Sequence, residues 1–167
     1  MKRTAVICAG TGATVLLAAG ARFTLAPLTV ARLLILGGAL GLLALHDIRE
    51  HRIPNRIVLP TAAMCAVLSF AQGIRLSTGL YLGAALVTLL LAVSLAAPAM
   101  LGMGDVKLAL LILCALDALA APALLAALEL YALTTLTLLI SRGRPALGTH
   151  LPLAPIIAAG CLITVLL

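Results

Sequence analysis

The sequence predicts an all-α protein, a polytopic transmembrane bundle of about six or seven helices. Hydrophobic residues make up 64% of its 167 positions and charged residues only 10%, and the mean hydropathy is +1.28. A water-soluble fold with this composition would have too few polar side chains to cover its surface. Several apolar runs reach or approach the roughly 20 residues that cross a bilayer as a helix. These runs are rich in Ala and Leu and lack period-two alternation, which favours helices over a barrel.

Seven spans are expected, and the fifth is unusually short. In chain order, charge, Gly or Pro breaks the apolar runs at "ARFTLAP", "LALHDIREHRIPNRIVLP", "GIRLSTG", "LGMGDVK", "ALAAP" and "SRGRPALGTH". The expected spans between these breaks are 5–21, 27–45, 57–72, 80–100, 106–119, 122–140 and 151–167. Because no long polar loop separates the spans, residues 1–167 are expected to form a single membrane-embedded domain.

The first apolar run has a second interpretation. The segment "MKRTAVICAGTGATVLLAAGA" has a basic start, an apolar core and small residues near a possible cleavage point, as a secretory signal does. Cleavage there would not change the orientation of the later spans.

The net charge of +6 is interpreted as a topology signal. The basic residues are scattered between spans and form no basic face studded with aromatic residues, so nucleic acid is not an expected partner, whereas membrane lipids are. With a cytoplasmic N-terminus, more basic residues lie inside than outside, as the positive-inside rule requires for a multi-pass protein of the cell membrane. The inner set is Lys2, Arg3, Arg49, Arg52, Arg56, Lys107, Arg142 and Arg144, and the outer set is Arg22, Arg32 and Arg75.

Two aspartates are predicted to meet at the inner boundary of the membrane. Asp47 ends one span and Asp105 begins another, and the two spans between them return the chain to the same side. An acid at membrane depth is a functional hypothesis by default. Two neighbouring carboxyl groups cannot both ionise cheaply, so one keeps its proton while the other stays charged. Such a pair can hydrolyse a peptide, because one acid activates water while the other polarises the carbonyl group.

The residues around the two aspartates are expected to shape the site. Gly102 and Gly104 remove side chains beside Asp105, which permits unusual dihedral angles and close approach of a substrate. Pro54 and Asn55 fit a turn that re-enters the membrane. Lys107 has two interpretations: a contact to substrate or to Asp105, or a plain interfacial lysine.

These segments resemble a known family. "DIREHRIPN" (47–55) followed by "GMGDVKL" (102–108) is similar to the motifs of the type IV prepilin peptidases, which are membrane aspartic proteases of the Gly-x-Gly-Asp class. "LPLAPIIAAG" (151–160) looks like a third family segment, a Pro-rich start to the last span. The resemblance implies that Asp47 and Asp105 are the catalytic pair and that no cofactor is needed. It also implies a pilin-like precursor as substrate, whose short basic leader is cleaved on the cytoplasmic side, commonly just after a glycine.

The chain also departs from the longer members of that family. Those members carry a cytoplasmic domain with paired C-x-x-C motifs and also methylate the new N-terminus. Here Cys8, Cys65, Cys114 and Cys161 stand singly within apolar segments, where they fit small hydrophobic residues and indicate neither a zinc site nor a disulfide. We therefore expect a peptidase without methyl transfer, similar to the short form of tight-adherence (Flp-type) pilus systems.

Other polar residues keep competing interpretations open. Asp117 is expected in a turn at the opposite face, and Glu129, well inside the sixth span, is expected to make a hydrogen bond within the bundle. His46 and His51 flank Asp47 but are a weak metal signal, so no metal site is predicted. Two alternatives remain: a small transporter or channel subunit that uses membrane carboxylates, and an assembly partner that has the fold without the activity.

Overall fold

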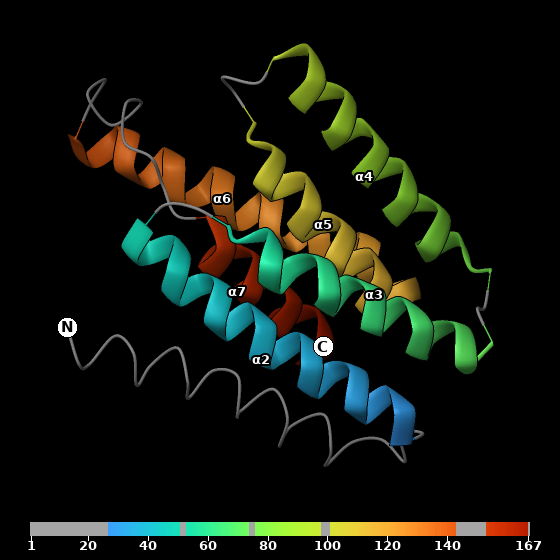
Figure 1. Ribbon diagram of the computed structural model, residues 1–167. Helices are drawn as coiled ribbons and strands as arrows, with labels where there is room; N and C mark the ends of the chain where they lie inside the picture. The colour runs from blue at the N-terminus through green and yellow to red at the C-terminus, as the bar shows by residue number, and fades with distance from the viewer. Residues whose placement is uncertain (1–26, 51–52, 74–75, 98–100, 143–152, 167) are drawn as a thin grey trace.

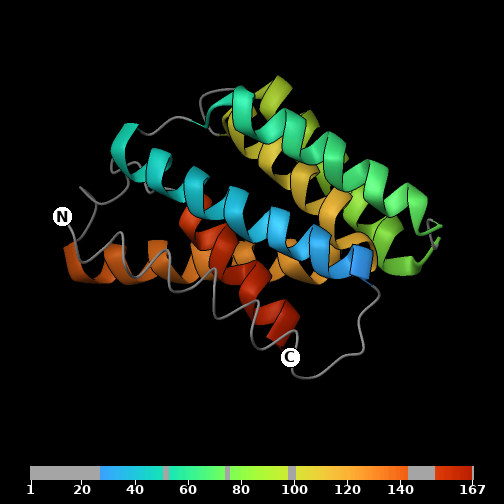
Figure 2. The same cartoon turned by 60° about the horizontal axis from the view of Figure 1, so that its bottom comes forward.

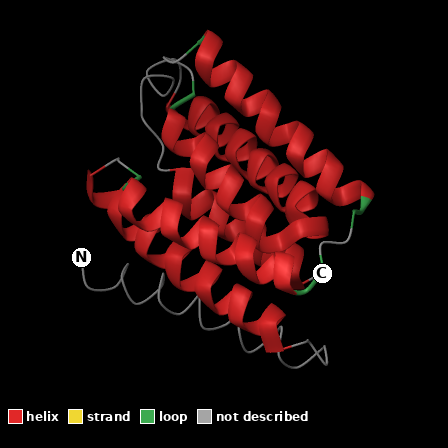
Figure 3. Cartoon of the chain, turned by 45° about the vertical axis from the view of Figure 1, so that its right-hand side comes forward, coloured by secondary structure: helices red, strands yellow, loops and turns green. Residues whose placement is uncertain are grey.

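The described part of the chain is a bundle of helices. The computed structural model describes residues 27–50, 53–73, 76–97, 101–142 and 153–166, and no strand occurs among them (Figure 3). The elements, labelled in Figure 1, are α2 (Pro27–Glu50), α3 (Asn55–Ala71), α4 (Thr78–Ala96), α5 (Met103–Leu116), the 3-10 helix η1 (Asp117–Leu119), α6 (Ala120–Arg142) and α7 (Leu153–Leu166). The all-α prediction is confirmed.

Three helical segments are long and apolar enough to cross a membrane. They are Pro27–Glu50, Thr78–Ala96 and Met103–Ser141, the last of which contains α5, η1 and α6. Asn55–Ala71 and Ala154–Val165 are shorter apolar helices. The expected span at 5–21 lies outside the described residues.

The other expected spans each correspond to one helix, although the ends differ by several residues. The clearest difference is in α2, which continues past the expected end at 45 through His46 and Asp47 to Glu50. A prediction based on hydropathy ends a span at the first charged residues. The helix itself can continue further, because its backbone hydrogen bonds also form in the polar region at the membrane boundary. Asp47 therefore lies on a helix and not in a loop. At the other end of the bundle, α5 stops at Leu116 because Asp117 takes a left-handed φ of 48°.

Successive helices alternate in direction, which gives the bundle two distinct ends. The C-terminal ends of α2, α4 and α6 lie toward the left in Figure 1, together with the N-terminal ends of α3, α5 and α7. Figure 2 shows α7 between α2 and α6, and α7 packs against both. Every residue near the start of α3, α5 or α7 therefore shares one end of the bundle with the last turn of α2.

The core between the helices is made of medium-sized aliphatic and small side chains. Its largest fully buried side chains come from α2, α3 and α5, and are Leu43, Val58, Cys65, Leu108, Leu111 and Ile112. Small residues of α6 and α7, such as Ala123, Ala127 and Ala154, complete it. Burial of Cys65 and Cys161 agrees with their interpretation as small hydrophobic residues.

Glycines bring some of these helices unusually close together. A Cβ atom added at Gly79 of α4 would lie 2.0 Å from the carbonyl oxygen of Ala118 in η1. One added at Gly160 of α7 would lie 2.6 Å from the backbone nitrogen of Ala127 in α6. Only a residue without a side chain permits these contacts, so they fix α4 against η1 and α7 against α6.

Candidate active site

Asp47 lies in the last two turns of α2, on the face that packs into the bundle. The buried positions of α2 form one stripe along the helix: Arg32, Leu36, Ala39, Leu40, Leu43, Ala44 and Asp47. This spacing of three and four residues is the ordinary pattern of a packed helix face. Because Asp47 continues the stripe, its carboxyl group is carried inward, and the residue is only 6% exposed.

The backbone of α7 supplies the hydrogen bond that a buried acid requires. The N–H of Ala154 donates to Oδ2 of Asp47 at 2.9 Å, across 107 positions of the sequence. Ala154 is the second residue of α7, and the first N–H groups of a helix have no partner within the helix. Pro155 also fits this first turn, since its missing N–H breaks no helical hydrogen bond there. The Pro-rich segment "LPLAPIIAAG" thus contributes a backbone donor to the site.

Asp105 stands in the first turn of its own helix. Gly102 caps α5 in an extended conformation, and the N–H of Asp105 donates to the carbonyl oxygen of Gly102 at 3.1 Å. A carboxylate in a first turn interacts favourably with the positive end of the helix dipole. Asp105 is half-buried, and Asp47 lies close enough to act on it electrostatically. The structure thus places the two predicted catalytic acids at one end of the bundle: Asp105 in the first turn of α5, and Asp47 near the C-terminal end of α2, where it accepts a hydrogen bond from the first turn of α7.

The two glycines beside Asp105 do not take the unusual dihedral angles expected of them. Gly102 has φ −72°, and among the described residues Gly73 is the glycine with positive φ. A Cβ atom added at Gly104 would lie 3.4 Å from Cβ and Cδ1 of Ile53. One added at Gly102 would lie 3.6 Å from Oδ2 of Asp105. Ile53 therefore packs beside Gly104 in the first turn of α5, and a Cβ atom at either glycine would be in ordinary van der Waals contact.

The remaining predicted site residues join α3 to α5. Pro54 precedes α3 in an extended conformation, and its carbonyl oxygen accepts hydrogen bonds from the N–H groups of Ile57 and Val58 at 3.1 and 3.3 Å. Asn55 is the first residue of α3, and its Oδ1 accepts a hydrogen bond from Nζ of Lys107 at 3.0 Å. Lys107 thus makes a specific contact to another helix, which a plain interfacial lysine would not make.

The competing polar residues lie elsewhere. Asp117 is a turn residue at the opposite end of the bundle, as predicted, where it pairs with Arg32. Glu129 lies on the exposed face of α6, so the expected hydrogen bond within the bundle is not made among the described residues. His46 has Nδ1 3.6 Å from Oε1 of Glu50, one helical turn away on the surface of α2. His51 lies outside the described residues.

Sequence reasoning found the acids but missed one functional group, the backbone N–H of Ala154. Almost every residue type has a backbone N–H group, so the identity of a residue does not show that its N–H is used in a site. The available signal was indirect: a Pro-rich start marks a helix N-terminus, which is where free N–H groups point at a ligand or an acid.

Comparison with known proteins identifies the family of this chain. The chain matches the sequence model of the type IV leader peptidase family over residues 34–166, a stretch that contains both aspartates and Ala154. Comparison with curated proteins and with solved structures gave no match. Because the matched stretch is far more than half of the sequence, the chain belongs to the type IV leader peptidase family.

Proposed function

We propose that this protein is an aspartic endopeptidase that removes the leader of pilin-like precursors at the cytoplasmic boundary of the cell membrane, without N-methyltransferase activity. Membership of the type IV leader peptidase family makes it a membrane peptidase with a protein substrate. The observation that supports the aspartic mechanism is the position of Asp47. It is buried, accepts a hydrogen bond from the N-terminus of α7 and lies within electrostatic range of Asp105. Both acids come from the segments that resemble the family motifs.

In the proposed reaction, one aspartate is ionised and the other is protonated. The ionised carboxylate takes a proton from water as its oxygen forms a bond to the scissile carbonyl carbon. The protonated acid hydrogen-bonds to the carbonyl oxygen, and a proton then passes to the nitrogen as the C–N bond breaks. The leader leaves with a new carboxyl group and the remaining chain with a new amino group. No covalent intermediate with the enzyme forms.

The contact with α7 limits how Asp47 can act. The N–H of Ala154 can only donate, so Oδ2 of Asp47 is held as an acceptor in either protonation state. The hydrogen bond therefore favours Oδ1 as the position of any proton on Asp47. A fixed orientation of this kind keeps the reacting oxygen in place without rearrangement during the reaction.

The remaining parts of the proposal rest on the sequence. Residues 1–167 form one peptidase domain, with the N-terminus in the cytoplasm and the end that carries Asp47 and Asp105 on the same side, as the distribution of basic residues favours. The cysteines of this chain form no C-x-x-C pair, which supports peptidase activity without methyl transfer. The protein would then act like the short form of tight-adherence pilus systems.

The decisive test is cleavage by purified, detergent-solubilised protein. The probe is a synthetic precursor with a Lys/Arg-rich leader, a glycine and an apolar helix of about 20 residues. Asp47→Asn and Asp105→Asn should each lower kcat by about 10²- to 10⁴-fold, because each removes one proton-transfer group. Glu50→Gln is the matched control, an exposed acid three residues from Asp47, and it should cleave normally.

The other outcomes point to the competing functions. Normal cleavage by either Asn variant, with its fold verified by circular dichroism, would remove the proposed reaction centre. No cleavage by the unmodified protein would favour an assembly partner without activity. A transporter predicts that Glu129→Gln abolishes function while Asp47→Asn is tolerated.

A further inference from the structure

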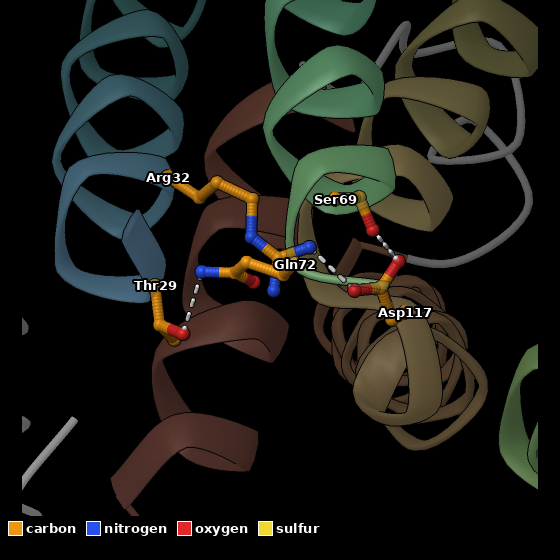
Figure 4. A network of polar contacts seen from close by, with 5 residues as sticks. All are labelled: Thr29, Arg32, Ser69, Gln72 and Asp117. Carbon is orange, nitrogen blue, oxygen red and sulfur yellow. Dashed lines mark hydrogen bonds and ion pairs between the residues drawn. The ribbon is translucent and has the colours of Figure 1, made fainter. Parts of the chain in front are cut away.

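The end of the bundle opposite Asp47 and Asp105 contains a second polar cluster, which the proposed reaction does not use (Figure 4). Arg32 of α2 forms an ion pair with Oδ2 of Asp117 in η1, and the Arg32 side chain is only 8% exposed. Ser69 of α3 donates its hydroxyl hydrogen to Oδ1 of Asp117 at 2.5 Å. Beside them, Nε2 of Gln72 donates to Oγ1 of Thr29 at 3.1 Å and joins α3 to α2 a second time.

Each catalytic aspartate shares a rigid element with one member of this cluster. Arg32 and Asp47 both lie on α2, 15 residues apart, which is about 22 Å along the helix axis. Asp105 and Asp117 lie at the two ends of α5, 12 residues apart, or about 18 Å. The ion pair therefore connects the far ends of the two elements whose near ends carry the catalytic acids.

Between Arg32 and Asp47, the side chains of α2 make no other polar contact to another helix among the described residues. The buried stripe between them consists of Leu and Ala, whose packing is not directional. The α2 glycines make no close contact either, since a Cβ atom added at Gly37, Gly38 or Gly41 would have nothing within 4 Å. This differs from α4 and α7, which glycine contacts hold against their neighbours. The described polar contacts from α2 side chains to other helices are therefore concentrated at its two ends, at Thr29 and Arg32 and at Asp47.

We propose that Arg32, Asp117 and Ser69 are positioning residues, which fix the axial register of α2 against α3 and α5 and so hold Asp47 level with Asp105. This inference rests on the proposed function for its catalytic consequence. A slip of one residue along a helix moves a side chain by about 1.5 Å. Displacements of about 1 Å in a catalytic group lower rates by about 10²-fold. Register control is also the best-attested use of a buried ion pair, which contributes little net stability.

The test removes the ion pair without leaving an unpaired buried charge. A single Asp117→Asn change strands the guanidinium of Arg32 and endangers folding. The double variant Arg32→Met with Asp117→Asn removes both charges; Asn tolerates the left-handed φ of 48° and can still bond Ser69. Its kcat per folded molecule should fall about 10- to 100-fold with KM within about twofold, because the acids are displaced and the substrate contacts are not. Arg32→Lys, which keeps the charge, should retain most of the activity.

A distance measurement tests the register independently of activity. Nitroxide labels at Ile48 of α2 and Phe70 of α3, both exposed, report sliding of the two helices when the native cysteines are replaced by alanine. In the double variant their separation, measured by pulsed electron resonance in detergent, should change by about 1.5 Å or more. An unchanged separation overturns the proposal whatever the rate does, and so does an unchanged kcat with a changed separation. If the unmodified protein does not cleave the precursor, the proposed function is wrong. The distance between the labels still tests whether the ion pair fixes the register of α2.

Discussion

The close contact between α7 and α6 makes Gly160 a sensitive test of how the active site is supported. A Cβ atom at residue 160 would lie 2.6, 2.8 and 2.9 Å from the N, Cα and Cβ atoms of Ala127. Ordinary van der Waals contact begins at 3.4 Å, so Gly160→Ala must move α7 away from α6 by about 3.4 − 2.6 = 0.8 Å. Two of the three opposing atoms belong to the backbone of a helix, and they cannot turn aside as a flexible side chain would.

That displacement should reach Asp47, one of the two proposed catalytic acids. Ala154 lies six residues before Gly160 on the same helix, and its N–H donates to Asp47 at 2.9 Å. A rigid shift of 0.8 Å would lengthen this contact to as much as about 3.7 Å, which is beyond hydrogen-bonding distance. A hydrogen bond to a charged group is worth about 1.5–3 kcal/mol, and overpacking adds about 1–3 kcal/mol. Gly160→Ala should therefore lower both the free energy of unfolding, by about 2.5–6 kcal/mol, and kcat.

The control is Gly41→Ala in α2, where an added Cβ atom meets nothing within 4 Å. This variant makes the same chemical change in a transmembrane helix, and it should be neutral or stabilising by up to about 1 kcal/mol. Both variants are compared by thermal unfolding in detergent and by the initial rate of precursor cleavage. Equal melting temperatures and equal rates for the two would refute the idea that the spacing of α7 supports Asp47.

Three further predictions concern the contacts around the site and the chemistry. Lys107→Met and Asn55→Ala should each weaken the same 3.0 Å hydrogen bond, so a double-mutant cycle on stability should give a coupling of about 0.5–1.5 kcal/mol; zero coupling would show that this contact does not matter. Gly79→Ala, whose Cβ atom would lie 2.0 Å from the carbonyl oxygen of Ala118, should lower the melting temperature more than Gly160→Ala does. Excess EDTA should leave the initial cleavage rate unchanged, since the proposed reaction needs two carboxyl groups and water; loss of activity that added metal restores would contradict the mechanism.

The sequence predicted the helices and the common end of Asp47 and Asp105, but not the contacts that hold them. Hydropathy and breaks in apolar runs locate helices, and counting spans between two residues gives their side of the membrane. The same approach treated Arg32 only as a topology charge, because nothing local shows that its partner is Asp117, 85 positions away. It also gave Gly102 and Gly104 two roles, unusual dihedral angles and close approach of a substrate; the structure shows no positive φ at either glycine, and the close approach stays a prediction.

The alternation of helix direction explains why this end of the bundle can hold two acids. The N-termini of α3, α5 and α7 all lie there, and each N-terminus carries a partial positive charge of about half an elementary unit. Asp105 stands at one of these N-termini and Asp47 accepts a hydrogen bond from another, so the backbone offsets part of the cost of placing acids at the edge of a membrane. At the opposite end, η1 separates Asp117 from such a position, and the acid is balanced by Arg32. An acid balanced by dipoles keeps an oxygen free for proton transfer, whereas Asp117 has both oxygens engaged, by Arg32 and Ser69. The way each acid is stabilised therefore distinguishes the end of the bundle that carries the proposed catalytic acids from the opposite end.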